Sequence, residues 1–151
     1  MNIIEILPAS NTCAQINCDS KKSVLEKMSQ MLTQNTQGIT QKEVFNSLIE
    51  REKLGSTAIG YGVAIPHARI EGIHKPIGAL LQLHQPIHFD APDEESVDLL
   101  FGLIMPMECT EDQLRVLANL AEFFSNAALR DALRTAQDHQ TLYHIAVDKA
   151  Q

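Results

Sequence analysis

Apolar residues recur at helical spacing in two segments near the start of the chain. Residues 20–32 carry such a stripe behind Ser20, whose hydroxyl can cap a first helical turn. Residues 40–54 carry a second stripe, and Thr40 with Glu43 forms a capping-box pattern before it. Gly55 follows directly and suits the C-terminal end of a helix. The pattern therefore predicts two amphipathic helices.

The middle of the chain shows patterns that are typical of strands. In residues 76–84 every second position is apolar, from Ile77 to Leu83, which predicts a half-buried strand. Residues 99–105 are almost continuously apolar over a short span, as in a central strand that is covered on both faces. Between these strands and the second helix, residues 55–62 hold three glycines and indicate a loop.

The last third of the chain returns to helical spacing. One helix is expected over residues 109–124, with Thr110 and Gln113 as a capping box and a stripe from Leu114 to Phe124. Shorter helices are expected over residues 127–136 and, behind Asp138, over residues 141–148. With no repeat or long linker, the order of elements predicts an α/β (α+β) fold: a single layered domain over residues 1–151.

Composition narrows the class of partners. The chain has 12 Lys and Arg against 19 Asp and Glu, a formal net charge of −7, which disfavours a nucleic-acid partner because such binding depends on clustered basic side chains. It suits an encounter with a positively charged protein surface. Residues 97–107, the longest apolar run, are too short to span a bilayer and include Asp98 and Pro106, so no membrane insertion is expected.

Cysteine use and the N-terminus indicate a cytoplasmic protein. Cys13, Cys18 and Cys109 are an odd number without a CxxC pair, which argues against a disulfide framework. The apolar start of the chain, "MNIIEILP", is short and lacks a basic region, so it does not predict a signal peptide.

The glycine-rich loop does not predict a nucleotide cofactor. Gly55 to Gly60 has the glycine spacing of a P-loop, but Tyr61 and Gly62 stand where Lys and Ser or Thr are required. The apolar residues that follow also rule out a dinucleotide fingerprint. Glycine here is expected to allow positive φ angles and close backbone approach.

The histidines other than His67 do not predict a metal site. His84 and His88 have the spacing of a helical ligand pair, but Pro86 between them disrupts a helix, so both are expected at the end of a strand. The remaining three have no Cys, Asp or Glu at ligand spacing. They are His74, His139 and His144.

His67 has an unusual setting in the segment "GYGVAIPHARI". Pro66 fixes its own φ and pushes the preceding residue into an extended conformation, so the approach to the ring is rigid. An imidazole is largely neutral at neutral pH and can act as a nucleophile towards a phosphoryl group, whose oxygens need donors. Candidate donors nearby in the sequence are Arg51, Ser56 and Thr57. From the residues alone, a structural and a reactive histidine remain equally open.

A resemblance to a known protein family favours a reactive histidine at position 67. Residues 51–70 read "REKLGSTAIGYGVAIPHARI", which closely resembles the active-site signature of enzymes IIA of the mannitol/fructose class in the bacterial phosphotransferase system. The similarity extends to "SKKSVLEKMSQML", to "PIHFDAPDEESVDLLFGLIMP" and to "LRTAQDHQTLYHI". Within this class the chain is most similar to the nitrogen-regulatory enzymes IIA. The resemblance thus covers nearly the whole chain.

The resemblance implies a phosphocarrier with a mixed β-sheet flanked by helices. His67 would receive a phosphoryl group on Nε2 from a phosphohistidine of an HPr-like protein, without a metal or nucleotide cofactor. Arg51 would contact the phosphate and the partner, with Ser56 and Thr57 as further supporting residues. The phosphorylation state would regulate target proteins, among which potassium-transport and sensor-kinase proteins are candidates.

Two positions depart from the family pattern. Many members carry a second active-site histidine in a His-Leu pair, where this chain has Gln113 and Leu114. Glutamine can donate a hydrogen bond to phosphate but cannot carry a proton, and its alternative role is in the capping box. Tyr61 replaces a residue that is often small or polar, and it could narrow the site or lie on the surface.

Three other functions remain open at this point. The first is a sugar-specific enzyme IIA that passes phosphate to an enzyme IIB. The second is a non-catalytic binding module, in which the unphosphorylated surface alone engages targets and His67 is vestigial. The third is a histidine-based metal site.

Overall fold

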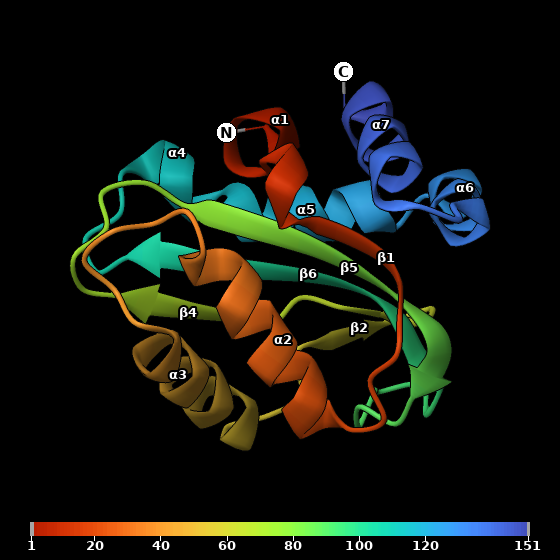
Figure 1. The fold of residues 1–151 in the computed structure, drawn as a ribbon, viewed down its shortest axis with the longest axis horizontal. Coiled ribbons are helices and arrows are strands. Elements are labelled where there is room, and N and C mark those ends of the chain that lie inside the picture. Colours follow the sequence, from red (N-terminus) through yellow and green to blue (C-terminus); the bar gives the residue numbers. More distant parts are fainter. Residues whose placement is uncertain (1, 151) are drawn as a thin grey trace.

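The computed structural model describes residues 2–150, so Met1 and Gln151 of the predicted domain lie outside the described residues. Its central feature is a six-stranded mixed sheet in the order β1-β5-β6-β3-β2, with β4 also pairing with β6 (Figure 1). The strands are β1 (Thr12–Ile16), β2 (Ala58–Gly60), β3 (Val63–Ala64), β4 (His67–Ile70), β5 (Ile77–Ile87) and β6 (Val97–Pro106). The fold class predicted from the sequence and the resemblance is therefore confirmed.

Strand β6 is central to the sheet because three other strands pair with it. It pairs antiparallel with β5 and parallel with both β3 and β4. The register of β3 continues into β4, with Val63 opposite Leu99 and His67 opposite Leu103. Pro66 stands between them without an N–H, but its carbonyl accepts a 2.9 Å bond from the Leu103 amide. His67 is thus placed by an almost continuous line of main-chain bonds along β6.

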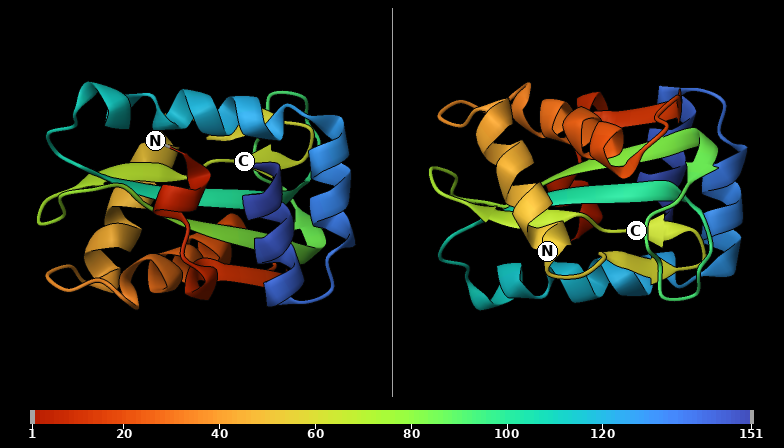
Figure 2. Two further views of the ribbon diagram at one scale, coloured as in Figure 1. Left: turned by 90° about the horizontal axis from the view of Figure 1, so that it is seen from above. Right: turned by 90° about the horizontal axis from the view of Figure 1, so that it is seen from below.

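Helices cover both faces of the sheet. Helices α2 (Lys21–Thr33) and α3 (Gln41–Lys53) pack on one face. The opposite face carries α1 (Ile3–Ile6), α5 (Val116–Phe124), α6 (Ala127–Thr135) and α7 (His139–Lys149). Figure 2 shows the second group from above and the first from below. The remaining short elements are η1 (Ala9–Asn11) and α4 (Glu111–Leu114).

The predicted helix starts are largely confirmed. Ser20 caps α2, the Thr40 hydroxyl accepts a 3.1 Å bond from the Glu43 amide at the start of α3, and Asp138 caps α7. The return bond at α3 differs from a capping box, because the Glu43 carboxylate accepts from the Thr40 hydroxyl. Helices α6 and α7 occupy the predicted positions, although α7 begins earlier, at His139.

The strand predicted at residues 76–84 is confirmed as part of β5, but its predicted half-buried character was wrong. Leu80 and Gln82, on the face expected to be open, are buried like Leu81 on the other face, because helices cover both sides of the sheet. The strand also continues through Pro86 to Ile87. By contrast, the covered strand expected at residues 99–105 is confirmed as part of β6.

The single helix expected over residues 109–124 was also wrong. The Thr110–Gln113 capping box is present, but the short helix α4 that it starts ends at Leu114. The Arg115 amide bonds to the Asp112 carbonyl three residues back, which tightens the turn before α5 begins. Leu114 consequently leaves the buried stripe and is 51% exposed.

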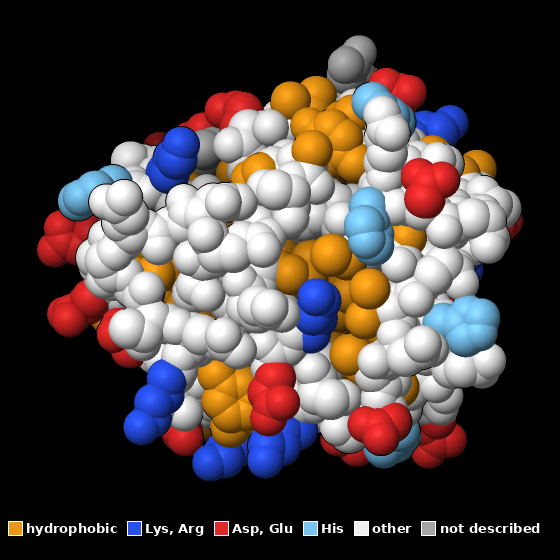
Figure 3. All heavy atoms as spheres, viewed as in Figure 1, with side chains coloured by type: hydrophobic (Ala, Val, Ile, Leu, Met, Phe, Trp, Pro, Cys, Tyr) orange, Lys and Arg blue, Asp and Glu red, His pale blue; other side chains and the backbone are white. Residues whose placement is uncertain are grey.

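The surface of the described residues carries mixed charge. On the face of Figure 3, acidic side chains are distributed around the periphery and are interspersed with Lys and Arg. Within residues 2–150 no helix is both long enough and apolar enough to cross a bilayer.

Candidate functional site

His67 lies in a hollow at the edge of the sheet. Strand β4 begins at this residue, and the hollow, of about 640 Å³, lies between the end of α3 and the α4–α5 segment. Polar side chains in its lining include Arg51 and Arg69, and the exposed Leu54 and Leu114 form part of its rim. The sheet edge therefore presents the ring in a partly apolar recess whose lining includes two arginines and the carboxylate of Glu50.

A main-chain contact sets the state of the His67 ring. Its Nδ1 lies 2.8 Å from the carbonyl oxygen of Ile65. Because a carbonyl oxygen only accepts, Nδ1 carries the proton in this contact, and Nε2 of the neutral ring keeps its lone pair. The residue two positions before the histidine thus selects the tautomer.

The electrostatic surroundings favour the neutral ring. Burial lowers the pKa of His67 below its usual value, and the Arg51 guanidinium lowers it further. The bond to the Ile65 carbonyl and the Glu52 carboxylate act in the opposite direction, but the net shift of the pKa is downward. The ring is accordingly prepared to act as a nucleophile near neutral pH.

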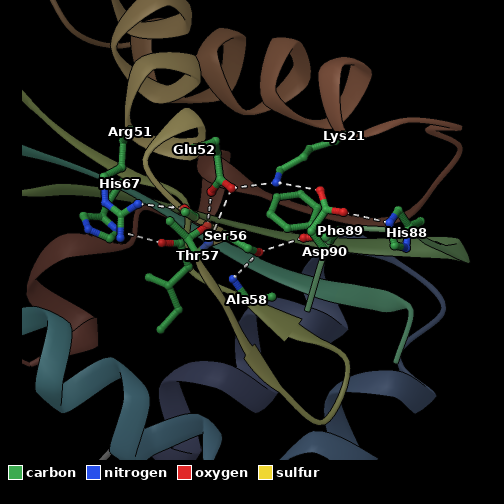
Figure 4. A network of polar contacts seen from close by, with 12 residues as sticks. Lys21, Arg51, Glu52, Ser56, Thr57, Ala58, His67, His88, Phe89 and Asp90 are labelled. Atoms are coloured by element: carbon green, nitrogen blue, oxygen red, sulfur yellow. Dashed lines mark hydrogen bonds and ion pairs between the residues drawn. The ribbon is translucent and has the colours of Figure 1, made fainter. Parts of the chain in front are cut away.

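Arg51 is the predicted site residue that the structure brings together with His67. It lies in the last turn of α3, beside the His67 ring in Figure 4 and in the lining of the same hollow. Its Nη1 donates a 2.8 Å bond to the Gly55 carbonyl, which fixes one side of the guanidinium against the loop after α3. The planar group has further N–H donors for an anion.

The hydroxyls of Ser56 and Thr57 are engaged by protein groups. Ser56 donates a 2.7 Å bond to the Phe89 carbonyl and accepts one of 3.1 Å from the Ala58 amide. Thr57, which is 5% exposed, donates its hydroxyl to a carboxylate oxygen of Glu52. The structure therefore places both residues in the wall behind the site and does not bring their hydroxyls to the hollow.

Gln113 is likewise directed elsewhere. Its side-chain oxygen accepts a 3.1 Å bond from the Thr110 amide, and its nitrogen points towards the His74 carbonyl at 3.4 Å. Leu114 and Leu117 line the hollow, whereas Gln113 is absent from its lining. The capping box thus engages Gln113, the residue for which the sequence resemblance implied a place beside the phosphoryl group.

Tyr61 lies on the surface, in the turn between β2 and β3. It has a positive φ of 59° and is 64% exposed. Arg130 stacks on its ring at 4.4 Å, and its carbonyl accepts a 2.6 Å bond from Arg134. Tyr61 does not belong to the lining of the His67 hollow, so it does not narrow that site.

Sequence reasoning missed a buried acid behind the site. Glu52 is 9% exposed, and its Oε2 lies 2.9 Å from Lys21 Nζ (Figure 4). A signal was available, because Val44, Leu48 and Glu52 are spaced four apart on one face of α3 and the first two are buried. A carboxylate in such a stripe requires a partner.

The histidines assigned no role make local polar contacts. His84 Nδ1 lies 2.8 Å from the Gln15 side-chain oxygen, and His88 Nε2 lies 2.8 Å from an Asp90 carboxylate oxygen. Within the described part of the chain, no three His, Cys, Asp or Glu side chains gather in a way that could hold a metal ion.

Comparisons with known proteins agree on one family. The family described as "Phosphoenolpyruvate-dependent sugar phosphotransferase system, EIIA 2" matches residues 5–148. A "Nitrogen regulatory protein" of Pseudomonas aeruginosa is 40% identical over 144 residues, covering 95% of this chain and 94% of that protein. The crystal structure of nitrogen regulatory protein IIA-Ntr from Neisseria meningitidis is 38% identical with a TM-score of 0.88, over 95% of this chain and 98% of that one. The fold is shared with the crystal structure of IIA mannitol from Escherichia coli. That structure is 16% identical and has a TM-score of 0.75, and the match covers 92% of this chain and 97% of that one.

Proposed function

The chain belongs to the EIIA 2 family of the phosphoenolpyruvate-dependent sugar phosphotransferase system, and from this premise we propose that it carries a phosphoryl group on His67. The donor is a phosphohistidine of an HPr-like protein, and the acceptor atom is Nε2. The phosphorylation state then regulates other proteins.

The tautomer of His67 carries the proposal. Nδ1 donates to the Ile65 carbonyl, so the lone pair of Nε2 is free to attack phosphorus. In the in-line transfer, the new N–P bond forms at Nε2 while the N–P bond of the donor breaks, and the donor ring keeps the electron pair of that bond. The Ile65 carbonyl stabilises the positive charge that develops on the attacking ring. Because donor and acceptor are both phosphohistidines, positioning is the main contribution required of the protein.

Arg51 stabilises the transferring group in this mechanism. Its guanidinium lies beside the ring, and the Gly55 contact leaves further N–H groups for phosphoryl oxygens. Ser56 and Thr57 support the site as parts of the loop that carries Gly55, because their hydroxyls are engaged by other groups. Gln113 contributes through the capping box that holds Leu114 at the rim.

Regulation of target proteins is the biological role that the similar proteins favour. The chain is 36–40% identical to several proteins named nitrogen regulatory protein, over more than 90% of its length. The second candidate is transfer to an enzyme IIB of a sugar system, which membership in a family of the sugar phosphotransferase system favours. Potassium-transport and sensor-kinase proteins are the classes of target to examine first.

Intact-mass measurement tests the proposal directly. The protein is incubated with phosphoenolpyruvate, enzyme I and an HPr-type donor, and we expect an acid-labile gain of one phosphoryl group. His67→Ala is expected to abolish the gain, whereas His144→Ala, which removes an exposed histidine of α7, should leave it intact. If no donor of this type phosphorylates the wild-type protein, the proposal fails. Rapid onward transfer to an enzyme IIB would favour the sugar-system alternative.

A further inference from the structure

A series of contacts connects Lys21 on α2 to the ring of His67. Lys21 Nζ pairs with Glu52 Oε2 at 2.9 Å, and the Glu52 carboxylate accepts both the hydroxyl and the 3.3 Å amide bond of Thr57. The Thr57 carbonyl in turn accepts a 3.0 Å bond from the Ile65 amide. The Ile65 carbonyl then accepts from His67 Nδ1 at 2.8 Å (Figure 4).

The ion pair between Lys21 and Glu52, the first contact of this series, carries a desolvation penalty. The side chain of Glu52 is 5% exposed and that of Lys21 is 24% exposed, so both charges are largely removed from water. A buried ion pair seldom adds stability over an apolar pair, because desolvation offsets the attraction. The pair is therefore better explained by what the carboxylate holds, namely both polar groups of Thr57.

We propose that Glu52 is a positioning residue for His67. By accepting the hydroxyl and the amide of Thr57, it fixes the main chain that pairs with Ile65, and Ile65 then holds the ring in the tautomer with Nε2 free. Lys21 orients the carboxylate through its 2.9 Å contact with Oε2. The part of this inference that concerns phosphoryl transfer rests on the proposed function, whereas the part that concerns the ring does not.

Two variants interrupt the series at neighbouring links. Glu52→Gln removes one of the two acceptors offered to Thr57 and removes the closer of the two carboxylates that pair with Lys21, leaving Asp90 at 3.6 Å. Thr57→Val keeps the shape of the side chain and removes only the hydroxyl. Glu26→Gln, on the exposed side of α2, is the matched control for the loss of one negative charge.

The ring nitrogens of His67 provide the decisive readout, recorded by two-bond ¹H–¹⁵N spectroscopy on the unphosphorylated protein. In the wild-type protein and in Glu26→Gln we expect a protonated Nδ1 and an unprotonated Nε2. In Glu52→Gln and Thr57→Val the two nitrogen shifts should move towards each other as both tautomers become populated. Unchanged shifts in both variants would overturn the inference.

Phosphoryl uptake from an HPr-type donor is the second readout. We expect the rate to fall about tenfold or more in both variants, because small displacements of a reacting group have large effects on rate. A fall in rate without a change of tautomer would also contradict the inference, since the acid would then act by another route. If the wild-type protein takes up no phosphoryl group, the proposed function fails, and the nitrogen shifts still decide the role of Glu52.

Loss of folding is separated from loss of positioning by a double variant. Glu52→Gln could unfold the protein because it leaves the partly buried Lys21 with only the more exposed and more distant Asp90 carboxylate, at 3.6 Å, as counter-charge. Lys21→Met with Glu52→Gln removes both charges at similar volume. If the double variant folds and retains the wild-type tautomer and uptake rate, the inference is wrong.

Discussion

The ring of His67 and the carbonyl of Ile65 form the contact that fixes the tautomer of the ring. The 2.8 Å bond joins two residues separated only by Pro66. Proline fixes the main chain at this point, so the carbonyl is held in place to accept the Nδ1 proton. The ring nitrogen that keeps its lone pair, Nε2, is therefore determined by the main-chain contact with Ile65.

Phosphoryl uptake should depend on pH with a midpoint below the usual histidine pKa of about 6.5. Burial and Arg51 lower the pKa of His67, and the bond to Ile65 and the charge of Glu52 only partly oppose this. The rate should therefore be constant from pH 8 down to about 6.5 and should fall only as the ring becomes protonated at lower pH. Measurement of uptake rates across this range, together with an NMR titration of the ring, provides the test. A midpoint above 6.5 would contradict the assigned environment.

The lowered pKa of His67 should make the stability of the folded protein depend on pH. A histidine whose pKa is lower in the folded protein binds fewer protons there than in the unfolded chain, within the interval between the two pKa values. Its contribution to stability is therefore unaffected above about pH 6.5, and stability is lost as the pH falls through that interval. The difference in free energy of unfolding between the wild-type protein and His67→Gln should change with pH only below 6.5, as urea titrations at pH 7.5 and pH 5 can show.

Replacement of Arg51 should alter both the ring and the reaction. Arg51→Gln removes a cation beside His67, so the pKa of His67 should rise towards its usual value. The uptake rate should fall by about tenfold to a hundredfold, because a charged donor to the transferring group is lost. Lys53→Gln removes an exposed cation from the same turn of α3 and is the matched control. If the two substitutions change the uptake rate and the pKa of His67 equally, Arg51 acts only through its net charge and does not contact the transferring group.

A histidine at position 113, which the sequence resemblance led us to expect, should not accelerate phosphoryl uptake. Gln113 accepts from the Thr110 amide within a capping box, and it is not among the residues that line the hollow. Gln113→His should therefore leave the uptake rate within about twofold and cost about 0.5–1 kcal/mol through the weakened cap. Gln113→Glu, which keeps the capping box, should preserve the stability. A tenfold faster uptake by Gln113→His would show that this position does face the phosphoryl group.

The sequence predicted those elements whose hydrophobic period is undisturbed. Helices α2 and α3 and strand β6 have simple patterns, and they were predicted close to their observed bounds. Strands β1 to β4 are short, between 2 and 5 residues, and such lengths give no measurable period. The break at Arg115 also has no signal in the sequence, because residues 111–124 contain neither Gly nor Pro and are compatible with one continuous helix.

In the candidate site, too, the sequence predicted features that depend on nearby residues and missed contacts between residues far apart in the chain. The proximity of Arg51 to His67 followed from the family motif, in which both residues occur. The orientation of the Ser56 hydroxyl could not be predicted, because its acceptor is the carbonyl of Phe89, 33 positions away. The partner of Glu52 is similarly distant, since Lys21 lies on another helix. Polar side chains near a reactive residue in sequence are thus candidates whose direction only the fold determines.

The close packing of α2 on the sheet should make Gly102 intolerant of a side chain. A Cβ at this position of β6 would collide with the Sδ and Cγ atoms of Met28. Gly102→Ala should therefore destabilise the protein by about 1–3 kcal/mol, the usual cost of overpacking a core.

A double-mutant cycle distinguishes this collision from a backbone effect. Met28→Ala alone should cost about 2–5 kcal/mol through the cavity that it leaves, but combined with Gly102→Ala the cost should be less than the sum of the two. Gly38→Ala is the control, because Gly38 has open space around it and a φ of 87°. Its cost of about 1–2 kcal/mol reflects the left-handed backbone and should add to that of Met28→Ala without coupling. If urea denaturation shows that the losses in free energy of unfolding from Gly102→Ala and Met28→Ala are strictly additive, the contact between α2 and β6 is contradicted.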